Sequence, residues 1–380
     1  MASDPAQIAN GLSSAEPEEH RSARLWPKLA ISIALGALFA WLAARGGVPL
    51  VPPRSAWHQV SPWAVPGYLL SLCAVHYFRA SRWRFLIAPV KRVPFSDVIL
   101  LNWVGFFAIF ALPLRLGEFA RPALTKLRHG VPISAGFGTV AAERVIDGLL
   151  TSLCVAFTLF ALPRLPTTDS VARHLPTYGY LALGLFACAF LALGMFLWQR
   201  SLAVRWTQRG VGLVSKRLGA LLAEKVSNVA DGLHSLASPR LAAGFLAESL
   251  IYWGSNALGV WFLGRAVGLP MEFGHALAVM GVLAIGILLP TGPGLFGNFQ
   301  LAVGACLKLF FPESEVATTG AVFVFLLYLL QSAVMIAAGV IPLYALKLRM
   351  RDLVQTGSSS ESAPDRAVDS PRVARREDEE

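Results

Sequence analysis

Long apolar blocks alternate with basic, polar segments along the chain. Six of these blocks can supply the roughly 20 residues that a membrane-crossing helix needs. We expect the full spans near residues 29–48, 63–88, 134–162, 177–198, 240–266 and 316–346. The pattern therefore predicts an all-α polytopic membrane protein with about six full spans.

Two further apolar blocks are interrupted by proline and glycine. Residues 95–113 end at Pro113, ahead of a cluster of glycine and charged residues, and residues 274–290 run into LLPTGPGLFGNF before apolar sequence resumes. Proline and glycine at this density break helices, and irregular backbone at membrane depth is tolerated only where protein or water surrounds it. We therefore predict two re-entrant helical hairpins, each made of two half-helices that meet at a broken tip.

The basic residues between the blocks fix an orientation. With the N-terminus in the cytoplasm and both hairpins re-entrant, most lysines and arginines of the connecting segments lie inside, as the positive-inside rule requires. If residues 95–113 formed a full span instead, the four cations between residues 115 and 128 would lie outside. The charges thus predict a multi-pass protein with cytoplasmic N- and C-termini.

The two halves of the chain have the same order of elements. Each half consists of two spans, a hairpin and a third span, and the two halves start on opposite sides of the membrane. The first hairpin contains ALPLRLGEF and the second LLPTGPGLFGNF, which share Leu-Pro followed by Gly-x-Phe. This order predicts an inverted repeat, an arrangement in which transporters bind substrate where broken helices meet near the bilayer midplane.

Composition narrows the class of protein. The chain of 380 residues is 55% hydrophobic and 15% charged, whereas soluble chains are about 25% charged. A secreted disulfide scaffold, a nucleic-acid-binding domain and an ordinary cytosolic enzyme are excluded, and no nucleic-acid partner is expected. The net charge of +10 fits basic loops held against anionic lipid.

The predicted domain limits follow from these patterns. Residues 1–28 and 348–380 are polar and are expected to be disordered cytoplasmic tails, while residues 29–347 form the transmembrane domain. Residues 199–240 carry leucine and valine at helical spacing among basic residues. They predict an amphipathic helix on the cytoplasmic membrane surface, with a connector packed on the bundle as the alternative.

Two charged clusters lie within apolar sequence, in LPLRLGEFARP and in AAERVIDGLL. They contain the candidate head-group residues Arg115, Glu118, Arg121, Glu143, Arg144 and Asp147. Glu143 and Asp147 are four residues apart and share one helix face. Ionisable groups at membrane depth cost several kcal/mol unless they are paired or face water, so these residues are candidates for a functional site.

Two interpretations of the clusters remain open, and they do not exclude each other. In the structural one, Arg115 or Arg121 neutralises Glu143 or Asp147. In the functional one, a guanidinium holds a lipid phosphate because its planar fork donates in pairs, and the acids orient the arginines or meet a cationic or hydroxylated head group.

Other polar positions have weaker signals. We expect Asn102, Glu248 and Asn256 to be interhelical hydrogen-bond partners. The RASRWRF run, residues 79–85, is expected to be an interfacial anchor of arginine and tryptophan. The loop of the second hairpin contributes the candidate residues Pro290, Pro293, Gly294, Gly297, Asn298 and Gln300.

At these motifs the chain resembles the lysylphosphatidylglycerol synthase transmembrane-region family. That family's pattern runs approximately LP-x-R-x-GE-x-x-R and then ER-x-x-D, and the resemblance covers roughly residues 29–347. The residues that match are Pro113, Arg115, Gly117, Glu118, Arg121, Glu143, Arg144 and Asp147. Arg82-Trp83 is similar to the family's second-span ending, and PTGPGLFGNFQ resembles its second motif, with Gln300 where an acid is expected.

The resemblance implies a protein of the bacterial inner membrane, related to the flippase half of aminoacyl-phospholipid synthases. The bifunctional synthases carry a soluble aminoacyl-transfer domain after the membrane part. Only about 30 residues follow the last span here, fewer than a domain of about 100 needs, so we expect no lysyl-lipid synthesis by this chain.

We therefore expect a flippase or lipid transporter that moves a phospholipid or a polyprenyl-phosphate-linked lipid across the membrane. Membrane lipids and a lipid-synthesising enzyme are the expected partners, and no metal, cofactor or ATP-binding motif is present in the sequence. One alternative is an integral-membrane transferase that uses the paired acids as base or metal ligands. The other is a non-catalytic membrane scaffold.

Overall fold

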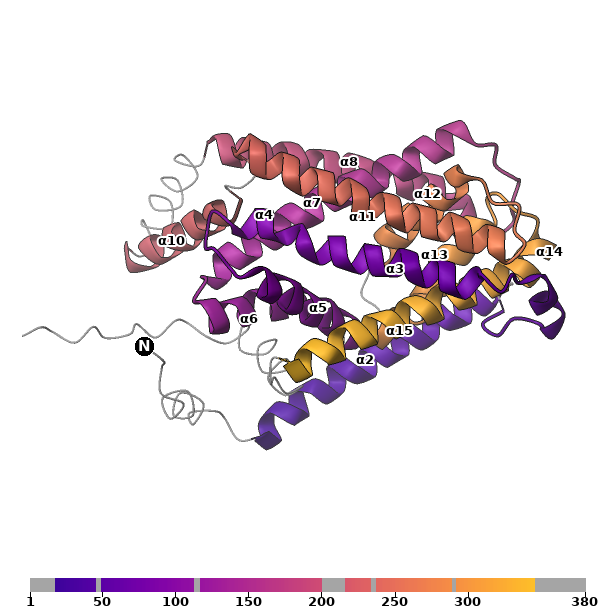
Figure 1. Cartoon of the computed structure of the whole chain (residues 1–380), viewed down its shortest axis with the longest axis horizontal. Coiled ribbons are helices and arrows are strands. Elements are labelled where there is room, and N and C mark those ends of the chain that lie inside the picture. Colours follow the sequence, from indigo (N-terminus) through magenta and orange to yellow (C-terminus); the bar gives the residue numbers. More distant parts are fainter. Residues whose placement is uncertain are drawn as a thin grey trace, which may run out of the picture.

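The computed structural model describes residues 18–45, 49–112, 117–199, 216–233, 237–288 and 292–345, and every regular element in these ranges is helical (Figure 1). In chain order the helices are α2 (Glu18–Arg45), η1 (Arg54–Gln59), α3 (Ala64–Ser81), α4 (Trp83–Ile87), α5 (Phe95–Ala111), α6 (Ala120–His129), α7 (Ile133–Ala161), α8 (Ser170–Trp198), α10 (Lys216–Leu233), α11 (Pro239–Ala266), α12 (Phe273–Gly286), η4 (Pro293–Leu295), α13 (Asn298–Leu307), α14 (Glu313–Glu315), η5 (Val316–Gly320) and α15 (Ala321–Ala345).

Helices lie over all six blocks that we expected to span the membrane. By length and apolar composition, Ile133–Ala161, Ser170–Trp198 and Glu313–Tyr344 qualify on their own as membrane-crossing helices. The second block is divided into α3 and α4, which meet at Arg82. The helix α2 already begins at Glu18, within the N-terminal segment that the sequence predicts to be disordered. Residues 1–17 and 346–380 of the predicted tails lie outside the described residues.

Both interrupted blocks consist of short helices with a break between them. The first block forms α5 and α6, and the second forms α12, η4 and α13. Two of the predicted breakers, Pro113 and Pro290, and also the candidate Arg115, lie outside the described residues. The chain returning from the first break passes so close to α5 that a Cβ at Gly117 would lie 2.0 Å from the carbonyl carbon of Ala108. Only glycine fits this position.

The bundle is held together by pairs of helices from different halves of the chain. α3 packs lengthwise along α11, α5 packs on α15, and α12 packs on α7. Figure 1 shows α3 and α11 side by side along the length of the molecule. At their contact Ser71 Oγ donates a hydrogen bond of 2.7 Å to the carbonyl of Ser255. Short polar side chains of this kind let helices approach closely in a membrane.

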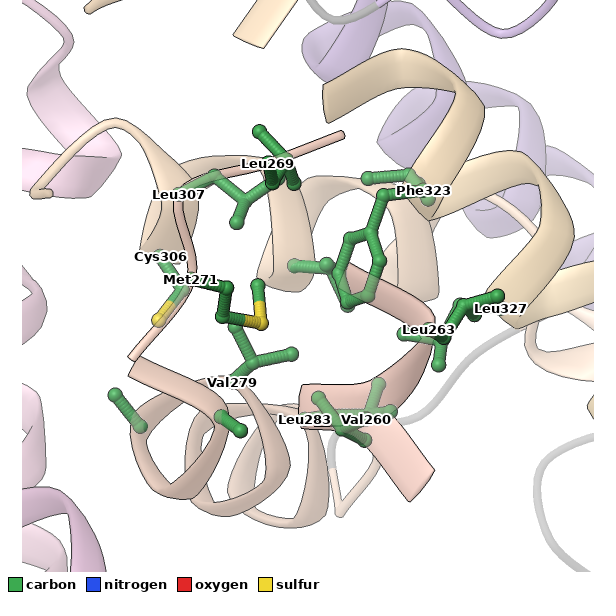
Figure 2. Packing of buried hydrophobic residues seen from close by; sticks show 14 of the residues in the cluster. Val260, Leu263, Leu269, Met271, Val279, Leu283, Cys306, Leu307, Phe323 and Leu327 are labelled. Atoms are coloured by element: carbon green, nitrogen blue, oxygen red, sulfur yellow. The ribbon is translucent and has the colours of Figure 1, made fainter. Parts of the chain in front are cut away.

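The largest apolar cluster lies where α11, α12, α13 and α15 meet (Figure 2). Phe323 and Leu327 of α15 pack there with Leu263 of α11 and Leu283 of α12. Within a membrane such side chains gain little by leaving lipid, so their close van der Waals packing with one another stabilises the cluster. This cluster fixes the second broken helix against the long helices around it.

The connector helix α10 lies within the region that we predicted to be amphipathic. Its C-terminal part packs on α7, where a Cβ at Gly232 would lie 2.1 Å from the carbonyl oxygen of Ala135, and Ala230 and Leu233 are buried. This part is therefore packed on the bundle, as the alternative interpretation of the sequence has it. Residues 200–215 and 234–236 of the predicted connector lie outside the described residues.

Candidate functional site

Arg82 is the centre of a buried ion network. It lies between α3 and α4, and its side chain has no exposed surface. Its Nη1 and Nη2 atoms each donate a 2.6 Å hydrogen bond to a different carboxylate oxygen of Asp147. Nη2 also donates to Glu143 Oε1 at 3.1 Å, and Nη1 donates to Ser249 Oγ at 3.0 Å. One guanidinium thus connects α3, α7 and α11.

Arg121 extends this network to the first interrupted block. From α6 its Nη2 donates to Glu143 Oε2 at 2.7 Å, and its Nη1 donates to Asn102 Oδ1 at 2.6 Å. Asn102 in turn donates to the carbonyl of Val98 at 2.7 Å within α5. The expected interhelical role of Asn102 is confirmed, and both short helices of this block are tied to α7.

The ion pairs confirm part of the structural interpretation of the charged clusters. The pairing of Arg121 with Glu143 is one of those that the sequence predicted, and Glu143 and Asp147 do share a face, because both contact Arg82. The partner of Asp147 is Arg82, which sequence reasoning missed.

The prediction that RASRWRF is an interfacial anchor is wrong at Arg82 and Trp83. Both are at most 1% exposed, and Trp83 Nε1 donates to Thr139 Oγ1 at 3.0 Å. The physical reason is charge balance, since two buried carboxylates on α7 need two buried cations. The sequence does contain a signal for this pairing. The two carboxylates require cations, and Arg79 and Arg82 lie three residues apart at the end of an apolar helix.

Aromatic rings enclose the network. The Arg82 guanidinium carbon lies 4.8 Å from the ring centroid of Tyr252, and the Arg121 carbon lies 5.3 Å from that of Trp83. Trp253 Nε1 donates to Asp147 Oδ1 at 3.0 Å. Cation–π contacts are worth more where water is excluded, so these rings stabilise the buried guanidinium groups.

A cavity of about 140 Å³ opens beside the network, between α3, α7, α11, α12 and α15. Its wall from α12, the turn after it, η4 and α15 is mostly apolar and includes Met280, Leu283, Ile287, Leu295 and Met335, with Gln331 of α15 as a polar member. The rest of its polar lining comes from α3, α7 and α11 and includes His76, Arg79, Arg144, Asp147, Trp253 and Asn256.

The charged lining residues gather at one end of this cavity. Along α3 the lining runs from Leu72 to Arg79, toward Arg82, and along α7 it runs from Thr151 to Arg144, next to Glu143. Arg79 and Arg144 lie close enough for their like charges to repel each other. Among the described residues neither has an ion pair with a carboxylate.

The remaining candidate of the first interrupted block, Glu118, lies on the other side of Arg144. A small space of about 10 Å³, lined by Glu118, Arg121 and Arg144 among others, separates α5 and α6 from α7. The Glu118 carboxylate acts on the Arg144 charge through space. All of the described charged candidates are therefore brought together around α7.

In the second interrupted block the polar candidates form hydrogen bonds with the backbone of the loop. Asn298 Nδ2 donates to the carbonyl of Gly286 at 2.7 Å, which joins the start of α13 to the end of α12. Gln300 Oε1 accepts a 2.7 Å hydrogen bond from the backbone N–H of Gly297, which has φ +83°. Pro293 begins η4, and the carbonyl of Gly294 accepts a hydrogen bond from Tyr328 at 3.1 Å. These contacts satisfy irregular backbone inside the protein.

Glu248 and Asn256 have different surroundings. Glu248 accepts hydrogen bonds from Ser81 Oγ and from the guanidinium of Arg84, which confirms its expected interhelical role. Asn256 lines the cavity instead.

One comparison with known proteins gives a family. The model of the family described as "Lysylphosphatidylglycerol synthase TM region" matches residues 29–335, most of the chain. The chain belongs to this family. No curated protein and no solved structure matches it.

Membership in the lysylphosphatidylglycerol synthase TM region family confirms the resemblance that the sequence motifs indicated. The matched residues include the whole ion network and the cavity beside it. Together with the long apolar helices, this identifies a helical membrane protein whose function is related to membrane lipids.

Proposed function

We propose that this protein is a flippase or lipid transporter, which moves a phospholipid or a polyprenyl-phosphate-linked lipid across the membrane. The observation that carries the proposal is the cavity, because a cationic end and an apolar wall meet in one space. A lipid has the same two parts. The head group would occupy the end at Arg79 and Arg144, and the acyl chains would stay along the apolar wall and in the bilayer.

Such a cavity would lower the free-energy cost of moving a lipid head group across the membrane. A charged group at the bilayer centre costs at least about 2.5–3.5 kcal/mol, and more without local water or partners. A head group that crosses next to fixed guanidinium groups avoids much of this cost. The acyl chains lose little by remaining against leucine, isoleucine and methionine side chains, which are as apolar as lipid.

We propose that the two halves form an inverted repeat with two re-entrant hairpins. The packing supports this, because the hairpin helix of each half packs on the last long helix of the other: α5 on α15, and α12 on α7. The second spans, α3 and α11, pack on each other, as elements beside a pseudo-twofold axis do. In transporters built this way, one repeat rocks against the other around a fixed central site.

We propose a bacterial inner-membrane location with both termini in the cytoplasm, on the strength of the basic connections and the family. Single-cysteine variants, made after the four native cysteines are replaced, test this orientation with an impermeant thiol reagent. Cysteine at Arg128 should react only from the cytoplasmic side, and cysteine at Arg54 only from the outside. Reaction of position 128 from outside would mean that α5 crosses the membrane completely.

We propose further that the acids of α7 do no transferase chemistry, and that a lipid-synthesising enzyme in the same membrane supplies the lipid. All four oxygens of Glu143 and Asp147 accept hydrogen bonds from Arg82 or Arg121. A carboxylate held in this way is a poor general base, because proton uptake would break a charge-assisted hydrogen bond. A purified protein that modified a lipid-linked substrate would contradict this proposal.

The deciding experiment is lipid movement in proteoliposomes that contain fluorescent lipids. The unaltered protein should move lipid between leaflets faster than protein-free vesicles do. Ala284→Phe, which places a large side chain in the cavity from its apolar wall, should slow this movement. Leu185→Phe, on the exposed face of α8, should not. No movement of any tested lipid by folded protein, or full activity of Ala284→Phe, would contradict the proposal.

A further inference from the structure

The charged groups around α7 do not balance. Four arginines, Arg79, Arg82, Arg121 and Arg144, surround three carboxylates, those of Glu118, Glu143 and Asp147. With the usual ionisation of these side chains at neutral pH, the described cluster carries a surplus positive charge. Uncompensated charge at membrane depth is costly, so a negative ligand would stabilise the cluster.

The surplus charge lies at the cavity. Arg82 and Arg121 are hydrogen-bonded to carboxylates, and neither lines the cavity. Arg79 and Arg144 do line it, and they repel each other. Arg79 is held in place, since its guanidinium carbon lies 3.9 Å from the ring centroid of Phe106, and Arg144 Nε has no hydrogen-bond partner among the described residues. A phosphate between the two arginines would relieve the repulsion and use free donors.

A third polar group faces the same space. His76 lies one helical turn before Arg79, is 6% exposed and lines the cavity. Its Nδ1 atom has no hydrogen-bond partner among the described residues. A buried polar atom without a partner costs about 1–3 kcal/mol, which points to a ligand or water that completes it.

The acids near the cavity are not available to an ammonium group. Asp147 lines the cavity, but Arg82 donates to both of its oxygens, and Trp253 Nε1 donates to Oδ1 as well. Glu143 is shared between Arg82 and Arg121. A cationic head group would therefore meet guanidinium groups without an unoccupied carboxylate to balance them.

We propose that this end of the cavity selects a lipid whose head group has a net negative charge and no ammonium group. Arg79 and Arg144 hold its phosphate, and His76 Nδ1 is a further polar contact. The inference rests on the lipid movement proposed above and names the substrate class of the same site. A soluble phosphate shares the anionic chemistry, but the apolar wall opposite the arginines fits acyl chains.

Binding by the detergent-purified, full-length protein tests the assignment without transport. The probes are the short-chain lipids dioctanoyl phosphatidylglycerol (anionic), dioctanoyl phosphatidylcholine (zwitterionic) and dioctanoyl ethylphosphocholine (cationic), with glycerol 3-phosphate as the soluble phosphate. The anionic lipid should bind about tenfold more tightly than the other two lipids. Equal or tighter binding of the ammonium lipids would overturn the proposal, and equally tight binding of glycerol 3-phosphate would overturn the lipid assignment.

Variants then locate the binding site. Arg79→Gln with Arg144→Gln should weaken binding of the anionic lipid about tenfold or more, and His76→Ala should weaken it less. Arg79→Lys with Arg144→Lys should recover part of the affinity, because the charge remains. Arg128→Gln, on the exposed surface, is the matched control. Unchanged binding by the folded glutamine double variant would overturn the site. If the double variant does not fold, the lipid comparison on the unaltered protein still decides the head-group class.

Failure of this inference differs from failure of the proposed function. Movement of phosphatidylcholine as fast as phosphatidylglycerol in vesicles would overturn the selectivity and leave lipid movement standing. Selective binding of the anionic lipid without any movement between leaflets would overturn the transport function and leave the binding site standing.

Discussion

Arg82 and Asp147 form a bidentate ion pair in which each of two guanidinium nitrogens donates to one carboxylate oxygen over 2.6 Å. Parallel hydrogen bonds between a guanidinium and a carboxylate fix orientation as well as distance. The pair joins the junction of α3 and α4 to the middle of α7, so it sets how the α3 wall of the cavity faces the α7 wall.

Arg82→Gln should be strongly destabilising. The substitution leaves Asp147 without its cation and Glu143 with only Arg121, and breaking a buried pair in this way costs about 3–5 kcal/mol. Unfolding of the detergent-purified protein by heat or denaturant measures the loss. Arg128→Gln, which removes an exposed pair with Asp97, should cost less than about 1 kcal/mol. Similar losses in the two variants would contradict the central role of Arg82.

Arg121 and Glu143 should show strong energetic coupling. Glu143→Gln leaves the buried Arg121 without a carboxylate partner, and Arg121→Gln leaves Glu143 with only Arg82, whereas the double change removes both charges together. The double variant should therefore be less destabilised than the sum of the single variants, with a coupling energy of about 0.5–3 kcal/mol. A double-mutant cycle measures it, and simple additivity would mean that the 2.7 Å contact contributes nothing.

The sequence predicts those features that depend on local pattern. Apolar length located the helices, proline and glycine located the breaks, and the spacing of Glu143 and Asp147 placed both on one face of α7. The choice of Arg82 as their partner depends on how α3 meets α7, across a long stretch of sequence. In the sequence alone, Arg82 next to Trp83 looks the same as an interfacial anchor. Only the burial of both side chains in the structure distinguishes a buried ion-pair partner from such an anchor.

The cavity could not be predicted from the sequence either, because it depends on contacts between helices that are distant in the chain. Arg79 and His76 line it from α3, while Met280 and Leu283 line it from α12, and no local pattern shows which helices face each other. The sequence names Asn298 and Gln300 as candidates, but their contacts with backbone depend on the loop conformation, which no local pattern shows.

Gly117→Ala should destabilise the first interrupted block. A Cβ there would lie 2.0–2.2 Å from the backbone of Ala108 and Ile109, so α5 and the returning chain would have to separate. We expect a loss of at least about 1–3 kcal/mol, as for overpacking of a core. Gly184→Ala, on α8 with open space around it, is the matched control and should be neutral or slightly stabilising. Equal unfolding temperatures of the two variants would contradict the close approach.

Gln300→Glu should leave the protein folded, whereas Gln300→Leu should lower its free energy of unfolding. A carboxylate oxygen can accept the hydrogen bond from the Gly297 N–H as the amide oxygen does, and an acid at this position matches the pattern of the family's second motif. Leucine removes the acceptor at the start of α13, and loss of such a cap costs about 0.5–2 kcal/mol. Denaturant unfolding compares the variants, and a Gln300→Leu protein as stable as the unaltered one would show that the contact is dispensable.

The contact between Asp169 and Lys308 should make stability depend on pH. Asp169 caps α8 by accepting from the Ala172 N–H at 2.9 Å, and it accepts from Lys308 Nζ at 2.7 Å. Burial by itself would raise the pKa of Asp169, but these hydrogen bonds and the lysine charge outweigh it and hold the pKa below its usual value of 3.8. The unfolded chain therefore binds this proton at a higher pH than the folded protein does. The stabilisation is complete above about pH 4 and is lost as the pH falls through the lowered folded pKa.

Asp169→Asn should accordingly lower the unfolding temperature at pH 7 by an amount that corresponds to about 1 kcal/mol or more, because the pairing with Lys308 is lost and the cap is weakened. The difference from the unaltered protein should shrink as the pH is lowered below about 4, because the unfolded chain takes up the Asp169 proton there, and it should vanish once the pH lies below the lowered folded pKa. Thermal unfolding of both proteins from pH 3 to pH 7 measures this convergence. A difference that stayed constant over the whole range would mean that the Asp169 charge contributes nothing to the contact with α13.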